Sequence, residues 1–536
     1  MPSKPVALVA FNEQDNLGIG YVASVLLQEG FHVRILDFRL GPDTILQHLQ
    51  RLDPIVVGFS VIFQHYIDSF RDLIQFLRRN GVSCHFSAGG HYPSLRYEQL
   101  LGLIAELDSV VLFEGELTFL ELVRALAQGE EWRRVPGLAF RRDGAVAVSA
   151  LRALESDLDR FPPPVRQPLR EYAFGKKFAT LLAGRGCAYH CSFCSIHEFY
   201  SRPPGPLKRV RRPEMVVREM ELLHEQRDCS IFMFQDDDFP IALRGGTWLA
   251  EFCQLLEASG LSTQVMWKIN CRPDEVHADT FAHLKAHGLF LVYLGIESGT
   301  DEGLRRMDKR MSVATSLRAA ECLKGLNIAF DYGYMLFDPS STFETVSGNL
   351  DFLDTLVGDG SSPVTFCKML PYAGTKVEQQ LLAAGRMLGP IGAEDYHFHD
   401  GRLDQLYELM ATSFSDWIGD HAGLLNLARW ARHFLMVWER YFVRSAEFDV
   451  LASTVRTIVA KSNRDFTRLA RQMMDVCRGD PSPGDRVSAA PLYREAVAVH
   501  SAYRARLEHV IDRLEHLERQ PALIQPQSVI LNHALA

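Results

Sequence analysis

Residues 177–200 read KFATLLAGRGCAYHCSFCSIHEFY, an apolar strand-like run followed by a glycine-led loop with three cysteines. The chain has 536 residues and ten cysteines, of which Cys187, Cys191 and Cys194 crowd into this one loop. The other cysteines are scattered in apolar contexts, where we expect reduced core residues. The spacing C-x3-C-x2-C therefore indicates a metal-binding loop placed directly after a strand.

Two kinds of metal centre are compatible with three cysteines. A tetrahedral zinc site needs four ligands, usually as paired C-x2-C units, and no second pair follows the loop. The nearest histidines, His190 and His197, lie within the loop itself. Three thiolates on one loop can instead ligate three irons of a four-iron, four-sulfur cluster and leave the fourth iron open. We predict the cluster, with zinc as the weaker alternative.

The chain around this loop alternates between strand-like and helical patterns. Six apolar runs separated by helical segments predict a partial (β/α)6 barrel over residues 171–390, with its chemistry at the C-terminal ends of the strands. The runs are 177–186, 230–239, 264–272, 289–299, 328–339 and 363–371. After residue 390 the strands stop, and residues 391–536 are predicted to form a helical C-terminal region.

Residues 1–135 show the same alternation and are predicted to form a doubly wound, Rossmann-like α/β domain. Such domains bind ligands beyond the carboxyl ends of their strands, here 12–18, 60–65, 89–93 and 114–116. Residues 136–170 lose the pattern, with a hairpin turn at 142–144 and a Pro162–Pro164 run, and are predicted to be a linker.

Composition excludes several classes of partner. The formal charge is −9, so we expect neither nucleic acid nor an anionic membrane as partner. No run reaches the length of about 18 apolar residues needed to span a bilayer, which predicts a cytoplasmic protein. The local basic run Lys208–Arg212 is interpreted as a solvated loop before a helix.

The cysteine loop, with Phe193 before its last cysteine, resembles the radical S-adenosylmethionine (SAM) enzymes. In that family the open iron binds SAM and an electron from the cluster cleaves it to a 5′-deoxyadenosyl radical. Further strand-end segments resemble the same family: QDDDF (235–239), NCRPDE (270–275), YLGIESG (293–299) and DYGYMLFDP (331–339). The resemblance implies SAM contacts from Phe193, Gln235, Asp237, Arg272, Glu297 and Tyr334.

Simpler roles exist for some of these residues. Glu297 has the alternative of a carboxylate at a helix N-terminus, and Arg272 that of a salt bridge within the barrel. Asp236, Asp237 and Asp238 have the alternative of a plain solvated loop.

The N-terminal domain resembles the flavodoxin-like cobalamin-binding domain of cobalamin-dependent radical SAM enzymes. The resemblance implies cobalamin contacts from Asn16, Leu17, Gly18, Ser60, Gly89, Gly90, His91, Glu114, Gly115 and Glu116. The chain departs from the cobalamin fingerprint D-x-H-x-x-G because Asp15–Gly18 contains no histidine. This argues for a cobalt without a histidine below it. The sequence leaves open whether His65 reaches the lower face of the cobalt. For His91 it leaves open a contact with the corrin ring or the role of a loop histidine that bonds to the backbone.

The resemblance implies three cofactors, a [4Fe-4S] cluster, SAM and cobalamin, and an external electron donor of the flavodoxin or ferredoxin type. Its reaction is transfer of a methyl group from methylcobalamin to an unactivated carbon, or with lower expectation to phosphorus, after hydrogen abstraction by the radical. By exclusion of nucleic acid and membrane we expect a small-molecule or peptide substrate, as in natural-product biosynthesis. The chemistry belongs to the cofactors, and no side chain is assigned as catalytic.

Other functions compete with methyl transfer. A non-methylating cyclase or rearranging enzyme of the same family would carry the same motifs. A transfer-RNA methylthiotransferase would carry three further cysteines in its N-terminal domain and a small C-terminal β-domain. Here that domain has only Cys84 and the C-terminal region is predicted to be helical. A cobalamin-dependent sensor without catalysis has no use for the three-cysteine loop.

Overall fold

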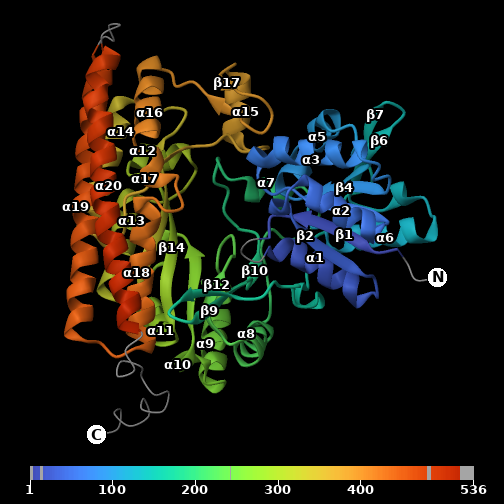
Figure 1. Cartoon of the computed structure of the whole chain (residues 1–536), viewed down its shortest axis with the longest axis horizontal. Helices are drawn as coiled ribbons and strands as arrows, with labels where there is room; N and C mark the ends of the chain where they lie inside the picture. The colour runs from blue at the N-terminus through green and yellow to red at the C-terminus, as the bar shows by residue number, and fades with distance from the viewer. Residues whose placement is uncertain (1–3, 13–15, 242, 480–484, 519–536) are drawn as a thin grey trace.

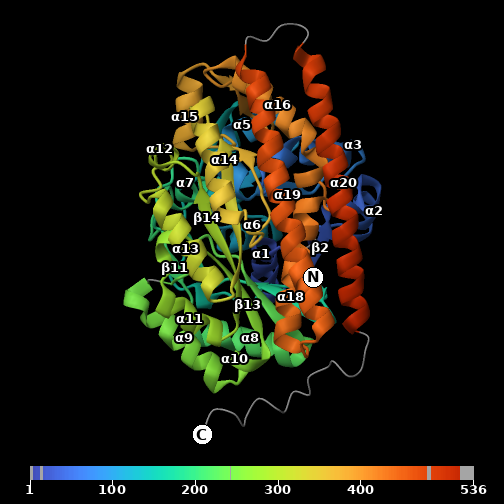
Figure 2. The ribbon, with the colours of Figure 1, turned by 90° about the vertical axis from the view of Figure 1, so that its left-hand side faces the viewer.

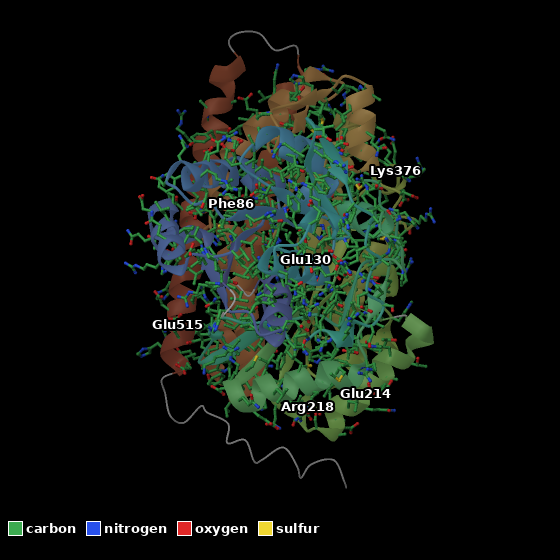
Figure 3. All side chains as sticks on the ribbon, turned by 90° about the vertical axis from the view of Figure 1, so that its right-hand side faces the viewer. Phe86, Glu130, Glu214, Arg218, Lys376 and Glu515 are labelled. Carbon is green, nitrogen blue, oxygen red and sulfur yellow. The ribbon has the colours of Figure 1, made fainter. Side chains whose placement is uncertain are left out.

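The computed structural model describes residues 4–12, 16–241, 243–479 and 485–518. In Figure 1 the N-terminal domain lies to the right, the barrel in the centre and the C-terminal helices to the left. Figure 3 views the molecule from the side of the N-terminal domain, which lies in front of the barrel. Among the described residues, no helix combines the length and the apolar character that a bilayer span requires.

The N-terminal sheet has the flavodoxin strand order. Five parallel strands follow the order β2-β1-β3-β4-β5, and the antiparallel hairpin β6-β7 extends the sheet beyond β5. The hairpin lies inside the range 136–170 that the sequence treats as linker, and it turns at residues 143–144 as expected. The strands are β1 (Val6–Ala10), β2 (Val33–Asp37), β3 (Val56–Ser60), β4 (His85–Gly89), β5 (Ser109–Val111), β6 (Leu138–Arg142) and β7 (Ala145–Val148).

Helices cover both faces of this sheet, which confirms the doubly wound fold. One apolar cluster joins the central strands to α1 and α6, and a second joins them to α2, α3, α4 and α5. Near-uniform burial of the central strands follows from this double cover. The helices are α1 (Leu17–Gln28), α2 (Pro42–Leu52), α3 (Ile67–Arg79), α4 (His91–Leu95), α5 (Tyr97–Leu103) and α6 (Glu116–Gln128).

The second large sheet is a curled half-barrel of the predicted kind. Its order is β16-β15-β14-β13-β12-β9-β8, and all neighbours are parallel except β8, which is antiparallel to β9. The parallel strands coincide with the six predicted runs, which confirms the partial (β/α)6 barrel. They are β9 (Lys176–Leu181), β12 (Cys229–Phe234), β13 (Met266–Cys271), β14 (Leu289–Glu297), β15 (Ala329–Phe337) and β16 (Cys367–Lys368), with β8 at Arg170–Ala173.

Helices pack on the outside of the barrel and short elements surround its rim. The outer helices are α8 (Pro213–Arg227), α9 (Thr247–Ala258), α10 (Leu261–Gln264), α11 (Ala278–Ala286), α12 (Asp301–Arg306), α13 (Val313–Gly325) and α14 (Phe343–Val357). The rim carries β10 (Gly184–Arg185), β11 (Arg209–Val210), α7 (Ser195–Ser201), α15 (Lys376–Ala383), β17 (Met387–Leu388) and β18 (Asp395–Tyr396). The short 3-10 helices are η1 (Phe38–Leu40), η2 (Gln64–Tyr66), η3 (Trp132–Arg134), η4 (Leu158–Arg160), η5 (Leu243–Gly246) and η6 (Pro273–Glu275).

The C-terminal region is helical, as predicted, and closes the open side of the half-barrel (Figure 2). Helix α18 contacts the sheet at β8, one of its edge strands, where His433 bonds to Tyr172, and at β15, the strand next to the other edge, where Arg432 bonds to Asp331. The Gly- and Pro-rich stretch RGDPSPGD (478–485) predicts a break between helices, and its residues 480–484 lie outside the described residues. The helices are α16 (Gly401–Ser413), α17 (Ser415–Ile418), α18 (Leu424–Tyr441), α19 (Ala446–Arg478) and α20 (Asp485–Glu518).

Candidate active site

A cavity of about 800 Å³ lies where the carboxyl ends of the N-terminal strands face the barrel. All ten residues expected from the cobalamin resemblance line it: Asn16, Leu17, Gly18, Ser60, Gly89, Gly90, His91, Glu114, Gly115 and Glu116. The barrel contributes Thr180, Leu182, Gln235 and Asp237. Residues 13–15 of the first strand-end loop lie outside the described residues. The strand ends of both domains therefore open onto one shared space.

The wall on the N-terminal side is shaped by glycine and by a helix cap. Gly90 has a φ of +119°, and a Cβ there would lie 2.4 Å from the carbonyl oxygen of Val61. Only glycine fits this position, which lets the backbone come up to the cavity. Asn16 caps α1 by accepting from the Ile19 amide at 3.1 Å, and its own amide donates to the Phe11 carbonyl. These bonds fix Asn16 and the start of α1 beside the cavity.

Two acidic residues of this wall link the domains. Glu114 accepts from Arg185 at 3.0 Å and from Arg209 at 2.8 Å, while Glu116 accepts from Arg185 at 2.7 Å. Burial opposes ionisation of Glu114, but the two guanidinium groups outweigh it and hold its pKa below the usual value. The arginines belong to β10 and β11, so these carboxylates are already engaged in joining the domains.

The histidines near the cavity have different surroundings. The His91 ring lines the cavity and stacks on Phe199 of α7, with centroids 4.1 Å apart. Desolvation lowers the pKa of His91 to about 4, so its ring is neutral at pH 7. His65 of η2 is exposed, does not line the cavity, and stacks with Phe63. The geometry thus brings His91, and not His65, to the cavity.

The cysteine loop follows β9 and leads into α7. Cys194 donates its amide to the Cys191 carbonyl at 3.1 Å, which folds the C-x2-C part into a tight turn. Ser192 fixes this turn to the barrel, since its amide donates to the Met307 carbonyl and its hydroxyl to the Arg306 carbonyl. Phe193 is partly buried against the barrel core. The loop is therefore fixed to the barrel by hydrogen bonds of Ser192 and by packing of Phe193.

Acidic residues after β12 hold the strand end that enters the loop. Asp236 accepts from the amides of Ala183 and Gly184, and Asp237 accepts from the amide of Gly186 at 2.9 Å. Burial raises the pKa of Asp236 to about 7. The alternative of a solvated acidic loop is therefore wrong for Asp236, and also for Asp238, which is buried and pairs with Lys208. Asp237 is exposed and lines the cavity.

Arg272 backs the cysteine loop from β13. Its guanidinium lies 3.8 Å over the Tyr189 ring and 3.9 Å from the Cys191 Sγ. The same group bonds Asp274 and the Lys309 carbonyl. The alternative of a salt bridge is thus confirmed for Arg272, and it holds the positive charge beside a cysteine of the loop, whereas the SAM contact stays a prediction.

Glu297 ends β14 in a strained backbone conformation, with a φ of +71°. Its carboxylate pairs with Lys309 at 3.4 Å and lies over the neighbouring glycines Gly295 and Gly333, where an added Cβ would meet its oxygens at 2.9 and 3.2 Å. The two glycines are paired in register between β14 and β15 and leave a side-chain-free floor. Tyr334 does not join this group, because its hydroxyl donates to the Asn349 carbonyl of α14 outside the sheet.

The basic run Lys208–Arg212 is not the predicted solvated loop. Arg209 and Arg211 are buried, and Arg211 pairs with Asp159 and Glu219. A basic run of this composition is found both in solvated loops and in buried interfaces, and the sequence does not distinguish them. The tertiary contacts of Arg209 and Arg211 do.

Sequence reasoning also missed a lysine inside the barrel. Lys268 of β13 lies in the same face of the sheet as Asn270 and Tyr293, and its Nζ is 5.9 Å from the Tyr293 ring. Desolvation lowers the pKa of Lys268 to about 8. A single charge in the apolar run QVMWKINC was the signal that could have found it.

Two protein families match the chain in sequence. The B12 binding domain matches residues 3–123, and the Radical SAM superfamily matches residues 181–344. The chain belongs to the cobalamin-dependent radical SAM enzymes. The first matched range contains β1 to β5 of the N-terminal sheet, and the second contains β12 to β15 of the barrel.

Relatives of this radical SAM enzyme carry different activities in their names. The uncharacterized methyltransferase PH0819 of Pyrococcus horikoshii is 26% identical over 379 residues, covering 69% of this chain and 79% of that protein. The anaerobic magnesium-protoporphyrin IX monomethyl ester cyclase of Rubrivivax gelatinosus is 28% identical over 342 residues, covering 61% of this chain and 60% of the cyclase. The structure of the cobalamin-dependent SAM radical enzyme OxsB, with aqua-cobalamin and SAM bound, shares the fold at a TM-score of 0.68 and 16% identity, covering 96% of this chain and 80% of OxsB.

The cofactors of this radical SAM enzyme family are cobalamin, SAM and a [4Fe-4S] cluster, and the described residues fit them. The cavity is large enough for a macrocyclic ligand and has a glycine wall that admits a flat one. Cys187, Cys191 and Cys194 all lie between β10 and α7, on one loop, and three thiolates are the donor set that leaves one iron of a cluster open.

The loop thiols Cys187 and Cys194 are protonated at neutral pH, so they lose their protons when iron binds. Burial raises the pKa of Cys187 to about 11 and that of Cys194 to about 12. Ligation requires thiolates, so cluster assembly in this radical SAM enzyme displaces protons from the loop.

Proposed function

We propose that this enzyme is a cobalamin-dependent radical SAM methyltransferase that methylates an unactivated carbon of a small-molecule or peptide intermediate. The supporting observation is the single cavity onto which the strand ends of both domains open. When bound, the cofactors supply a 5′-deoxyadenosyl radical on the barrel side and a transferable methyl group on the N-terminal side. A substrate between them would meet both without moving between sites.

Residues of the chain hold this arrangement in place. We assign the cluster to Cys187, Cys191 and Cys194, with Arg272 orienting the loop through its contact with Cys191. Gln235 and Asp237 line the shared cavity, whereas Glu297 stands over the glycine floor at the end of β14.

The N-terminal side is assigned to the ten cavity-lining residues named above. Glu114 and Glu116 act there through their ion pairs, which close the seam beside the cavity. A closed seam keeps water away from reactive intermediates. Cobalamin binds in this proposal without a histidine from the first strand-end loop, and His91 contributes a neutral ring.

The test is the fate of SAM during turnover. Methyl transfer consumes two molecules of SAM for each product, one cleaved to 5′-deoxyadenosine and one converted to S-adenosylhomocysteine. We expect the two in equal amounts, with the label of methyl-deuterated SAM in the product. In Cys191→Ala, 5′-deoxyadenosine formation should fall to background while cobalamin binding persists.

A non-methylating ring-forming enzyme is the second candidate, supported by the similarity to the anaerobic cyclase. This candidate expects 5′-deoxyadenosine and a product without added mass, and no S-adenosylhomocysteine. That result would overturn methyl transfer and leave the cofactor assignments standing.

A further inference from the structure

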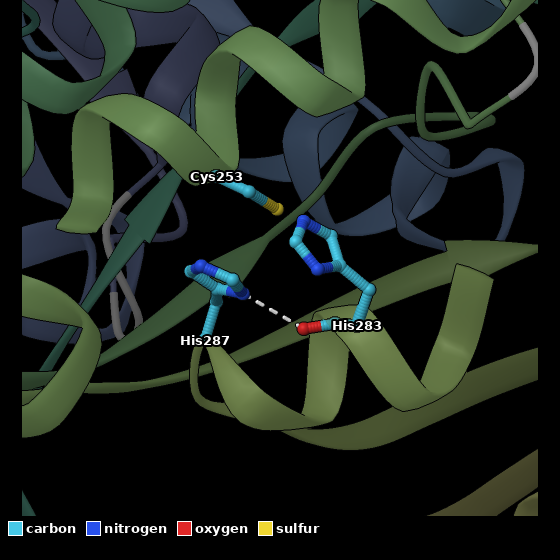
Figure 4. A group of neighbouring side chains, drawn as sticks. All are labelled: Cys253, His283 and His287. Atoms are coloured by element: carbon cyan, nitrogen blue, oxygen red, sulfur yellow. Dashed lines mark hydrogen bonds between the residues drawn. The ribbon is translucent and has the colours of Figure 1, made fainter. Parts of the chain in front are cut away.

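Four potential metal ligands converge between two outer helices of the barrel, far from the cavity. They are Cys253 and Glu257 on α9, and His283 on α11 with His287 directly after it. We call these residues the α9–α11 cluster. Each helix contributes its pair at a spacing of four residues, which places both side chains on the same face. Figure 4 shows Cys253, His283 and His287 pointing toward one another.

The geometry of the cluster is close to that of a ligated ion. The ligand atoms of Cys253, His283 and His287 all lie within 4.8 Å of one another. The Glu257 carboxylate lies 4.0 Å from the His287 Nε2 and supplies a fourth direction. Among the described residues, these three side chains form the group that satisfies this spacing. A tetrahedral ion needs movements of about 1 Å to reach Zn–N and Zn–S distances of about 2.0 and 2.3 Å.

The position of His287 is fixed by its surroundings. Its Nδ1 lies 2.8 Å from the His283 carbonyl, an acceptor that requires the proton on Nδ1. The lone pair is then on Nε2, the nitrogen that faces Glu257. The Trp267 indole donates to the His287 carbonyl at 2.7 Å and anchors the backbone. A histidine held by its other nitrogen in this way is the usual arrangement of a metal ligand.

We infer that the α9–α11 cluster binds a zinc ion through one thiolate, two imidazoles and the Glu257 carboxylate. A thiolate with two imidazoles is a donor set that suits zinc, whereas magnesium and calcium prefer oxygen ligands. Cys253 is buried and desolvation raises its pKa to about 12, so zinc displaces a proton from this thiol on binding. His283 is exposed, which leaves the ion a route of entry.

The place of the cluster in the fold indicates a structural site. His287 precedes β14, so the cluster lies at the N-terminal ends of the strands, whereas the cysteine loop follows the C-terminal end of β9. In Figure 1, α9 and α11 lie near the bottom, well below α7. Four protein ligands leave no open position for a substrate. The ion therefore ties α9 to α11 across the outer layer of the barrel.

The experiment measures zinc in the full-length holoenzyme prepared from zinc-supplemented cells. We expect about one zinc per chain in addition to the iron, and an X-ray absorption spectrum at the zinc edge with one sulfur at about 2.3 Å and nitrogen at about 2.0 Å. His283→Ala should lower the zinc content at least tenfold with the iron content unchanged. His283 is exposed, so this variant should fold, and Cys253→Ala should lose the sulfur scatterer.

The matched control is His277→Ala, an exposed histidine at the start of the same helix and outside the cluster. It should keep the full zinc content. Three results would overturn the inference: no zinc after supplementation, zinc retained in both His283→Ala and Cys253→Ala, or a zinc edge with several sulfur ligands, which would place the ion in the cysteine loop. Iron content reports separately on the cluster, so these results do not depend on the proposed reaction.

Discussion

The barrel joins its two neighbours by different kinds of contact. With the C-terminal helices it shares one continuous apolar cluster that runs from Ala173 to Leu517. The N-terminal domain has apolar clusters of its own, to which the barrel adds mainly Phe199 and Tyr200 at the rim. Its closest links to the barrel are buried ion pairs, such as those of Glu114. The C-terminal helices are therefore a fixed wall, whereas the N-terminal domain meets the barrel along a polar seam.

The polar contacts lie beside the cavity where ligands are expected to bind, and the apolar contacts lie away from it. Apolar burial is non-directional and gives stability wherever surfaces fit. Buried ion pairs gain little net stability because desolvation offsets attraction, but they fix orientation and are strongly disrupted when one partner is lost. The polar seam runs beside the cavity, where two domains must keep one alignment. Substitutions in the C-terminal helices should therefore change the stability of the whole protein, whereas substitutions in the polar seam should mainly change cobalamin binding.

The largest effect on stability should come from a substitution in the C-terminal helices. Trp438 is fully buried and packs on Phe174, Phe442 and Phe448. Trp438→Ala should lower the free energy of unfolding by about 3–5 kcal/mol, because a large cavity opens in a shared core. Hydrogen exchange should then speed up in β14 and β15 together with α18. Loss of protection in the C-terminal helices alone would contradict a core shared between these helices and the barrel.

Trp430 provides the control for this change. It lies on the same helix but is 47% exposed. Trp430→Ala should change stability by less than about 1 kcal/mol and leave exchange in the barrel strands unaltered.

Removing one arginine tests the seam. Arg209→Ala takes away a partner that bonds both oxygens of Glu114 and leaves that carboxylate buried with Arg185 alone. The docking of the two domains should weaken by about 3 kcal/mol. Cobalamin affinity, followed by absorbance titration, should fall while iron content stays the same.

Arg212→Ala is the matched control, because Arg212 follows in the same run and pairs with Asp159 but its side chain is 66% exposed. It should leave cobalamin affinity within about twofold. Equal losses of iron and cobalamin in Arg209→Ala would contradict a separate seam.

A glycine of the cavity wall gives a smaller and more local effect. Gly90→Ala places a Cβ 2.4 Å from the Val61 carbonyl oxygen at a positive φ, which should cost about 1–3 kcal/mol. Cobalamin affinity should drop about tenfold or more because the wall moves into the cavity. Gly102→Ala is the control, since its Cβ would meet no atom within 4 Å and it lies inside α5. That variant should be neutral or slightly stabilising.

Local patterns were sufficient to predict both sheets and the strand ends that line the shared cavity. Parallel strands collect their carboxyl ends on one edge, so strand-end residues such as Ser60 and Gly89 could be placed together without a structure. The partners of Glu114 could not, because Arg185 and Arg209 lie 71 and 95 residues away in the chain. The direction of the Tyr334 side chain could not be predicted for a different reason, since alternation along β15 turns it toward α14.

The smallest expected effect concerns protonation at the seam. His91 stacks on Phe199 across the domain boundary, and desolvation lowers its pKa to about 4, compared with about 6.5 in an unfolded chain. Between these values the unfolded state binds a proton that the folded state does not. The contribution of His91 to stability is therefore complete above pH 6.5 and is lost as the pH falls toward 4. At pH 5.5 the loss should be about 1 kcal/mol.

His91→Phe keeps an aromatic ring on Phe199 but cannot titrate, so it isolates the charge from the packing. Without added cobalamin, the thermal midpoint of the wild-type protein should fall more steeply between pH 7 and pH 5.5 than that of the variant. Other acidic and histidine groups shift both proteins equally, and only the difference between the two slopes reports on His91. Parallel curves would mean that this ring is already solvated at the seam. A steeper fall in the wild type would show that the seam excludes water even before a ligand fills the cavity, which is what a site for reactive intermediates requires.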